Sequence, residues 1–349
     1  MGSNPLGPTT QDDRDTVAVT GGSGFVGGHL VAALTDLGKN VVIVDLAKPP
    51  KALADLPGVQ HRRADLRDYG ETLLALRGVD TVYHLAGNAS GTLSVEYPRF
   101  DFQINGLGTC NVGNACVELG VRRLVHMSSA IVYGTPRHFP MNEKHPTAPF
   151  LPYGASKRSG ELTLLSLHEA FDLPVMIGRS FVVWGPGEDP RTAGGEVSQF
   201  LRWQLNELPI PVVGDVDRKT RDFVHVTDVC RALIALGDAG EPGEIYNIGS
   251  GTEVSMRGLA DAVADATGRP ARLQADTSVL DDSFRLVADI AKLRGIGYQP
   301  SVPLEKGLKD LADLLGPFPE LPTVTVAFRR EHAERGVGAA SAAARAAAR

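Results

Sequence analysis

The stretch Thr16-Val17-Ala18-Val19-Thr20-Gly21-Gly22-Ser23-Gly24-Phe25-Val26-Gly27 decides the fold of this chain. Its first five residues are a predicted strand, and Phe25 to Leu37 is a predicted helix that Gly38 ends. Glycines in the turn between them allow a tight bend, let the backbone approach a pyrophosphate, and let the helix lie close to the strand. The helix N-terminus then presents free N–H groups to phosphates. The stretch predicts a dinucleotide site, the alternative being a plain glycine turn.

Acidic residues after the next two predicted strands point to the ribose and the base of that dinucleotide. Asp45 ends the predicted strand Val41 to Asp45, 18 residues after Gly27. A carboxylate there holds a ribose 2′-hydroxyl and repels a 2′-phosphate, which favours NAD over NADP. The alternative is an acidic residue in a surface loop. Asp65 and Leu66 follow the third strand and could face the adenine, although Asp65 could equally cap a helix.

The first half of the chain alternates short β-branched runs with longer helical stretches, which is the pattern of a parallel α/β sheet. The further predicted strands are Val59 to Arg63, Thr81 to Leu85, Leu124 to Ser128 and Val175 to Arg179. Beyond Val183 glycine and proline cluster, and helices are predicted for Glu253 to Gly268 and for Leu304 to Leu315. We therefore expect a Rossmann-type, doubly wound parallel sheet with a smaller, interleaved α/β cap domain that binds substrate.

These patterns predict a division of the chain. Residues 1–14 are expected to be a disordered N-terminus, and residues 15–183 the NAD-binding domain with returns to the sheet around 222–250. Residues 184–221 and 251–320 are expected to form the substrate-binding domain. Residues 321–349, rich in alanine, are expected to be a C-terminal tail.

Composition excludes several classes of function. The chain has 349 residues, 43% of them hydrophobic, which suffices for a large core. Its net charge of −6 comes with well mixed charges and no basic block, so a nucleic acid partner is not expected. No apolar run has the length of a membrane span, and no signal peptide is evident. The three cysteines lack metal-ligand spacing, which indicates no metal, reduced thiols and a cytoplasmic protein.

A second motif, Tyr153-Gly154-Ala155-Ser156-Lys157, carries acid–base chemistry. Tyr153 and Lys157 share one helix face, and an ammonium beside a phenol favours the phenolate, so the tyrosine is expected to take a proton near neutral pH. Ser128 and Ser129 end a predicted strand, at the edge where α/β sheets bind ligands. A serine hydroxyl there could bind a substrate hydroxyl, or it could cap the next turn. The motifs together suggest that one alcohol group is oxidised, with a hydride leaving its carbon and a proton leaving its hydroxyl.

Taken together, the motifs resemble the extended short-chain dehydrogenases/reductases that act on nucleotide sugars. The resemblance covers residues 15–315. It is carried by Thr20 to Gly27, Asp45, Asp65-Leu66, His84 to Gly87, Asn105 to Thr109, Ser128 to Gly134, Tyr153 to Lys157, Trp184 to Gly187, Arg221 to Val229, and Tyr246 to Gly251.

The resemblance implies roles for the matched residues. Ser129, Tyr153 and Lys157 would be the catalytic set, with Tyr153 as the base and Lys157 also holding the nicotinamide ribose. Arg221 would grip the substrate's diphosphate, its alternative being an ion pair with Asp222 or a neighbour. The expected cofactor-binding residues are Gly21, Gly24, Phe25, Val26, Gly27, Asp45, Asp65, Leu66, Leu85, Ala86, Ser128, Tyr153 and Lys157, and the expected substrate-binding residues are Ser129, Arg221 and Arg285.

Residues 130 and 131 distinguish reactions within the family that the chain resembles. Members that dehydrate or decarboxylate sugars usually carry Glu at the second position, and those that epimerise at C3 and C5 carry Cys. Ala130 and Ile131 cannot move a proton. What remains is reversible oxidation and reduction of one carbon, best known in the nucleotide-sugar 4-epimerases. There Tyr153 would take the C4 hydroxyl proton as hydride passes to NAD, and both would return to the opposite face of the rotated 4-keto sugar.

Two positions depart from the family pattern. The usual Arg-x-x-Asn reads Arg179-Ser180-Phe181-Val182, and an arginine expected near residue 279 is Val279, with Arg285 nearby. In that family the Asn helps to hold the substrate and the arginine the diphosphate, so these departures argue against ordinary UDP-galactose and leave a rarer nucleotide sugar open.

Two other functions remain open at this point. One is a dehydrogenase or ketoreductase that uses the same residues on a sugar or another secondary alcohol and releases its reduced cofactor. The other is a dinucleotide-sensing regulator without catalysis, against which the complete Ser129, Tyr153 and Lys157 set argues. The resemblance also implies a homodimer through Phe100 to Leu119 and Tyr153 to Phe171, although the apolar faces of these segments could instead pack on their own sheet.

Overall fold

The structure, a computed structural model, describes residues 15–191, 195–276 and 285–322. The expected disordered N-terminus, Val279 and all but the first two residues of the expected C-terminal tail lie outside these ranges. Among the described residues, no helix is both long and apolar enough to cross a membrane.

Seven parallel strands form the central sheet, in the order β11-β6-β5-β4-β1-β2-β3. The order reverses on either side of β1, because β2 and β3 lie to one side of it and the other strands to the opposite side. The predicted strands are confirmed to within one residue at each end. The strands of the sheet are β1 Thr16–Thr20, β2 Asn40–Val44, β3 Val59–Arg62, β4 Thr81–His84, β5 Arg123–Ser129, β6 Val175–Ser180 and β11 Ile245–Ile248, the last of which was not predicted individually.

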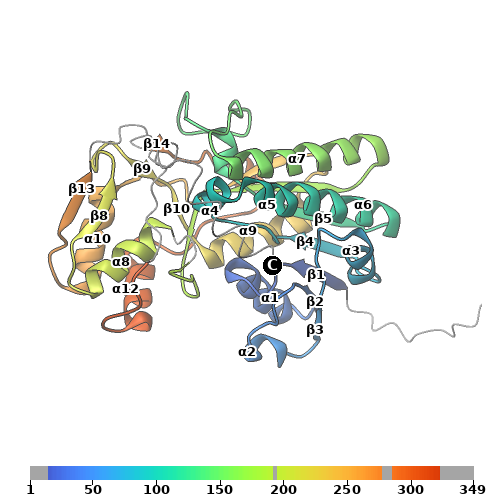
Figure 1. Cartoon of the computed structure of the whole chain (residues 1–349), viewed down its shortest axis with the longest axis horizontal. Helices are drawn as coiled ribbons and strands as arrows, with labels where there is room; N and C mark the ends of the chain where they lie inside the picture. Colours follow the sequence, from blue (N-terminus) through green and yellow to red (C-terminus); the bar gives the residue numbers. More distant parts are fainter. Residues whose placement is uncertain (1–14, 192–194, 277–284, 323–349) are drawn as a thin grey trace, which may run out of the picture.

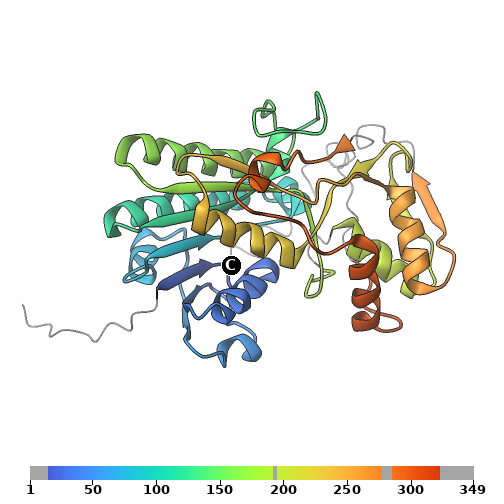
Figure 2. The same ribbon diagram turned by 180° about the vertical axis from the view of Figure 1, so that it is seen from behind.

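Helices cover both faces of this sheet (Figure 1). On one face α1 (Phe25–Asp36) and α9 (Val226–Ala239) enclose a core that includes Val19, Ile43 and Leu233. Figure 2 shows α9 from this side. On the other face α3 (Tyr69–Ala75), α6 (Thr109–Leu119) and α7 (Pro152–Phe171) enclose a second core with Val42 and Leu164. The predicted doubly wound α/β class is confirmed.

A smaller α/β body lies beyond the carboxyl end of the sheet (Figure 1). It packs α8 (Glu196–Leu205), α10 (Met256–Thr267) and α12 (Leu304–Leu315) against β8 (Ile210–Val213), which pairs with β13 (Leu273–Asp276). The prediction of a helix from Glu253 was wrong by three residues, because Val254–Ser255 form β12, which pairs with β9 (Thr220–Arg221), and Ser255 then caps the helix.

The remaining elements lie in the connections between those already named. They are α2 Lys51–Ala54, α4 Gly91–Glu96, α5 Pro98–Phe102, the π-helical turn η1 Gln103–Gly108, the 3₁₀ turn η2 Ala130–Tyr133, β7 Val182–Trp184, β10 Phe223–His225, β14 Arg285–Leu286 and α11 Ala291–Arg294.

Candidate active site

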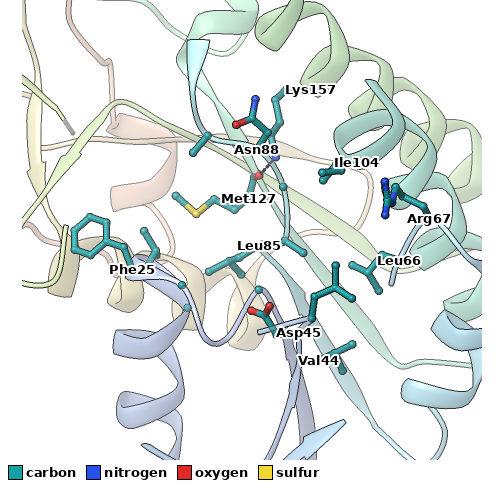
Figure 3. Close-up of a pocket in the computed structure, with 18 of the residues that line it drawn as sticks. Phe25, Val44, Asp45, Leu66, Arg67, Leu85, Asn88, Ile104, Met127 and Lys157 are labelled. Atoms are coloured by element: carbon teal, nitrogen blue, oxygen red, sulfur yellow. Dashed lines mark hydrogen bonds between the residues drawn. The ribbon is translucent and has the colours of Figure 1, made fainter. Parts of the chain in front are cut away.

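The carboxyl ends of the strands open into a cavity of about 440 Å³ where the strand order reverses. In open α/β sheets this crevice is the expected place for a ligand. Glycines that follow β1 line it, and so do residues that follow β2, β3 and β4 and the ends of β5 and β6. In the view of Figure 3, Lys157 and Asn88 lie at one end, and Asp45 and Val44 at the other.

The glycine turn leaves the backbone bare at the floor of this cavity. Gly21 has a φ of +71°, and a Cβ there would lie 2.8 Å from the backbone of Ala86. A Cβ on Gly27 would collide with the carbonyl oxygen of Gly21. The first turn of α1 has no side-chain cap, so its N–H groups are available to a ligand. A cradle without side chains at a helix N-terminus suits a pyrophosphate, as the sequence predicted.

Asp45 lies immediately after β2 with its carboxylate fixed in the cavity wall. Its two oxygens accept hydrogen bonds from the backbone N–H groups of Ser23 and Ala47, each at 3.0 Å. These bonds aim an anionic group at the space beside the glycine turn, where a diol can bind it and a phosphate would be repelled.

Asp65 and Leu66 line the same cavity after β3. The alternative in which Asp65 caps a helix is wrong, because Asp68 caps α3 by accepting from the backbone N–H of Glu71. Asp65 instead pairs with Arg67, whose Nε and Nη2 atoms lie 2.9 and 2.5 Å from the carboxylate oxygens. This pair lies at the cavity rim, where Arg67 also covers the Phe100 ring at 5.8 Å.

Tyr153 and Lys157 both face the cavity from the first two turns of α7. Pro152 begins this helix, because a proline needs no hydrogen-bond partner there and its fixed φ suits the first turn. The Ser129 hydroxyl at the end of β5 interacts with the Tyr153 phenol and lowers the pKa of that phenol, against the larger opposing effect of burial. Ser129 also accepts from the backbone N–H of Ile131 at 3.3 Å, which confirms the alternative in which it caps the next turn. Its contact with a substrate hydroxyl stays a prediction, and Ser128, not Ser129, is among the residues that line the cavity.

Burial shifts the pKa values of Tyr153 and Lys157 in opposite directions. It raises the pKa of Tyr153, the hydrogen bond with Ser129 lowers it, and Asp101 raises it further. Burial lowers the pKa of Lys157 to about 8, opposed by the carboxylates of Glu161 and Asp101. We expected the ammonium of Lys157 to lower the pKa of the Tyr153 phenol toward neutral pH. In the protein alone the pKa of Tyr153 is instead raised, because the cost of desolvating the phenolate is larger than the favourable interactions.

A buried ion pair that sequence reasoning missed lies one turn below Lys157. Glu161 accepts two hydrogen bonds from Arg179 of β6, at 2.9 and 2.8 Å, and a third from Arg158 at 2.7 Å. The side chains of Glu161 and Arg179 are 0% and 2% exposed. The sequence offers one signal for this site: Glu161 follows Lys157 by four residues, which places both on the same helix face.

The two predicted substrate-binding arginines lie outside the cavity lining. Arg221 is buried, with Nε 3.3 Å from Glu196, so an ion pair with a neighbour exists, but the partner is not Asp222. Asp222 instead accepts from Ser250, Gly251 and Ala288. Arg285 pairs with Glu253 at 2.5 Å and stacks on the Phe139 ring at 3.1 Å.

Comparison with known proteins agrees with this geometry. The model of the NAD dependent epimerase/dehydratase family matches residues 17–249. The chain belongs to this family. It is 35% identical to the UDP-glucose 4-epimerase of Mycolicibacterium smegmatis over 299 residues, 83% of this chain and 95% of that one. It is 34% identical to the dTDP-glucose 4,6-dehydratase of an Actinoplanes species over 313 residues, 84% and 95% of the two chains.

The solved structures include the UDP-glucose 4-epimerase of Thermus thermophilus in complex with NAD. It superposes with a TM-score of 0.76 at 32% identity and covers 85% of this chain and 98% of its own. Family membership confirms the predicted resemblance to extended short-chain dehydrogenases/reductases and the prediction of NAD as cofactor. Within the family, relatives of similar identity are both epimerases and dehydratases.

Proposed function

We propose that this enzyme epimerises a nucleotide-diphosphate sugar at C4 through transient oxidation to a 4-keto sugar. The observation that carries the proposal is that, among the described residues lining the cavity near Tyr153 and Lys157, none is a second acid or base that could move a proton. The only carboxylates in the described lining are Asp45 and Asp65, both on the adenosine side, and that lining contains no histidine, cysteine or glutamate. Ile131 lies against Gly154, beside Tyr153. By the family pattern given above, members that dehydrate sugars usually carry Glu at the position of Ile131.

In this proposal each residue has a defined task. NAD, when bound, supplies the hydride acceptor and donor. The glycine turn and the α1 N-terminus bind its pyrophosphate, and Asp45 binds the adenosine ribose. Tyr153 accepts the C4 hydroxyl proton and later returns it, while Ser129 hydrogen-bonds that hydroxyl and Lys157 stabilises the phenolate. With only one proton donor, the cycle ends in a stereoisomer and not in loss of water.

The proposal also assigns the parts of the chain. Residues 15–183 with the returns around 222–250 would bind NAD, and residues 184–221 and 251–320 would bind the sugar nucleotide. Arg221 is the proposed ligand of the diphosphate, since a buried guanidinium at the edge of the smaller body can offer a fork to two phosphate oxygens.

The test is incubation of the purified protein with NAD and a panel of UDP-, dTDP- and GDP-hexoses. Sugar identity is followed by NMR or chromatography, and reduced nicotinamide by absorbance. A stereoisomer of unchanged mass without accumulating NADH supports the proposal. Stoichiometric NADH with a product lighter by two hydrogens contradicts it in favour of a dehydrogenase, and a product lighter by one water contradicts it in favour of a dehydratase. Tyr153→Phe is the control, which keeps NAD binding and loses turnover.

The family resemblance also supports a homodimer through the helical face that contains α6 and α7. Several large apolar side chains are exposed on this face, among them Leu107, Leu162 and Phe171. We propose that a second copy of the chain covers them. Sedimentation should show a dimer that Leu162→Glu weakens, and a monomer at all concentrations would contradict this arrangement.

A further inference from the structure

Asp101, which the sequence analysis did not single out, is a fully buried carboxylate directly behind the wall that carries Tyr153 and Lys157. It lies on α5. One oxygen accepts hydrogen bonds from the side-chain amides of Asn88 at 2.7 Å and Asn105 at 3.0 Å. The other accepts from the hydroxyl of Ser156 at 2.5 Å. A carboxylate in this position is costly unless hydrogen bonds compensate for lost water, so these contacts fix it firmly.

Ser156 connects Asp101 to the catalytic turn. It lies between Tyr153 and Lys157 in the chain, and its hydroxyl also contacts the carbonyl oxygen of Tyr153 at 2.9 Å. Asn105, which donates to both Asp101 and Ser156, lies in the π-helical turn Gln103–Gly108, where the helix is wider. Asn88, which holds Asp101 from the other side, lines the cavity itself. The four side chains form one network from the cavity wall to the backbone of α7.

Asp101 accepts hydrogen bonds but forms no ion pair with any described residue. Glu161, on α7, is paired with Arg179 and Arg158. His84 of β4 and His126 of β5 are fully buried, and burial lowers the pKa of His84 to about 3 and that of His126 well below its ordinary value, so both are neutral. Among the described residues, no cationic group lies within ion-pair distance of Asp101, and its charge raises the pKa of both Tyr153 and Lys157.

We propose that Asp101 is a positioning residue that holds the turn from Tyr153 to Lys157 and sets the protonation of both groups together. This inference rests on the proposed roles of those two residues. The negative charge keeps Lys157 an ammonium, and it also keeps Tyr153 protonated until substrate and the oxidised nicotinamide supply opposing charge.

The decisive variant is Asp101→Asn, which keeps the shape and removes the charge. Activity should rise with pH as Tyr153 deprotonates and fall as Lys157 loses its proton. Without the charge, both limbs of the kcat/KM profile should move to lower pH, each by about 0.5 to 1 pH unit. Asp101→Ser, measured alongside, removes the charge with a smaller side chain and should give the same displacement. Glu169→Gln, which removes an exposed carboxylate from α7, should leave the profile unmoved.

Two outcomes overturn the inference. If activity falls while both limbs stay in place, Asp101 only supports the fold. If one limb alone moves, Asp101 does not set the protonation of Tyr153 and Lys157 together. Ser156→Ala should lower kcat with the limbs in place, because the charge remains. The ultraviolet titration of the phenol, taken as the difference from Tyr153→Phe with and without NAD, needs no sugar. It should move to lower pH in Asp101→Asn even if no tested sugar is converted, which separates failure of the proposed function from failure of this inference.

Discussion

Lys157 Nζ donates a hydrogen bond to the main-chain carbonyl oxygen of Met127 at 2.6 Å, which ties α7 to the end of β5. This contact holds a buried ammonium at the base of the cavity, pointing past the strand that ends in Ser128 and Ser129. The fold therefore positions the charge that would stabilise a phenolate at Tyr153, at a cost in desolvation.

The first prediction concerns alkaline pH. Because burial lowers the pKa of Lys157 to about 8, activity should decline as pH rises through that value and the ammonium becomes neutral. The kcat/KM profile of the wild type should show this limb. Lys157→Met should lack it and should be about a hundredfold less active or worse at neutral pH, because a charge aimed at the reacting group is lost. A wild-type profile flat up to the ordinary lysine range would contradict this.

The second prediction is that the same variant is more stable. The folded pKa of Lys157 lies below its unfolded value of 10.5, so the unfolded chain binds more protons between about pH 8 and 10.5. At pH 7 the buried ammonium therefore costs about 3 kcal/mol, and this cost disappears as pH rises through that window. Urea unfolding should show Lys157→Met to be more stable at pH 7, with the advantage shrinking toward pH 10. Equal stability at pH 7 would show that the ammonium is well solvated.

The third prediction concerns the buried pair beneath Lys157. Arg179→Met should destabilise the fold by about 3 to 5 kcal/mol, since Glu161 would keep only the partly exposed Arg158 as a partner. The double variant Glu161→Met and Arg179→Met should recover most of this loss, because no unpaired charge remains. Denaturant unfolding of the two single variants and the double variant gives the coupling. Additive losses would contradict a coupled pair.

The strand ends and the cavity could be predicted because the chemistry there is encoded locally. Gly21 and Asp45 each follow a β-branched run, and parallel strands bring their carboxyl ends to one edge. The partners of Arg221 and Arg179 could not be predicted, because Glu196 and Glu161 lie on other elements and an ion pair has no spacing rule across a fold. The direction of the pKa shift of Tyr153 could not be predicted, because burial of the phenol raises its pKa and the lysine spacing carries no information on burial.

The fourth prediction uses two adjacent glycines as a matched pair. A Cβ at Gly27 would collide with the carbonyl oxygen of Gly21, which cannot move without opening the turn. Gly27→Ala should therefore weaken NAD binding strongly and destabilise the fold by about 1 to 3 kcal/mol. At Gly28 the Cβ would lie 3.2 Å from the flexible end of Leu53, so Gly28→Ala should bind NAD normally. Calorimetric titration of both variants with NAD checks this, and equal affinities would show that the turn does not hold the cofactor.

The last prediction concerns cofactor choice. The Asp45 carboxylate is held by two backbone N–H groups, so it cannot swing away from a 2′-phosphate. Asp45→Asn keeps the shape and removes the charge. It should lose about tenfold to a hundredfold in NAD affinity, the value of a charge-assisted hydrogen bond, and should gain affinity for NADP as the repulsion disappears. Titration of wild type and variant with both dinucleotides measures the ratio. If Asp45→Asn weakens NAD and NADP equally, the carboxylate supports the turn at Ser23 and does not select the ribose.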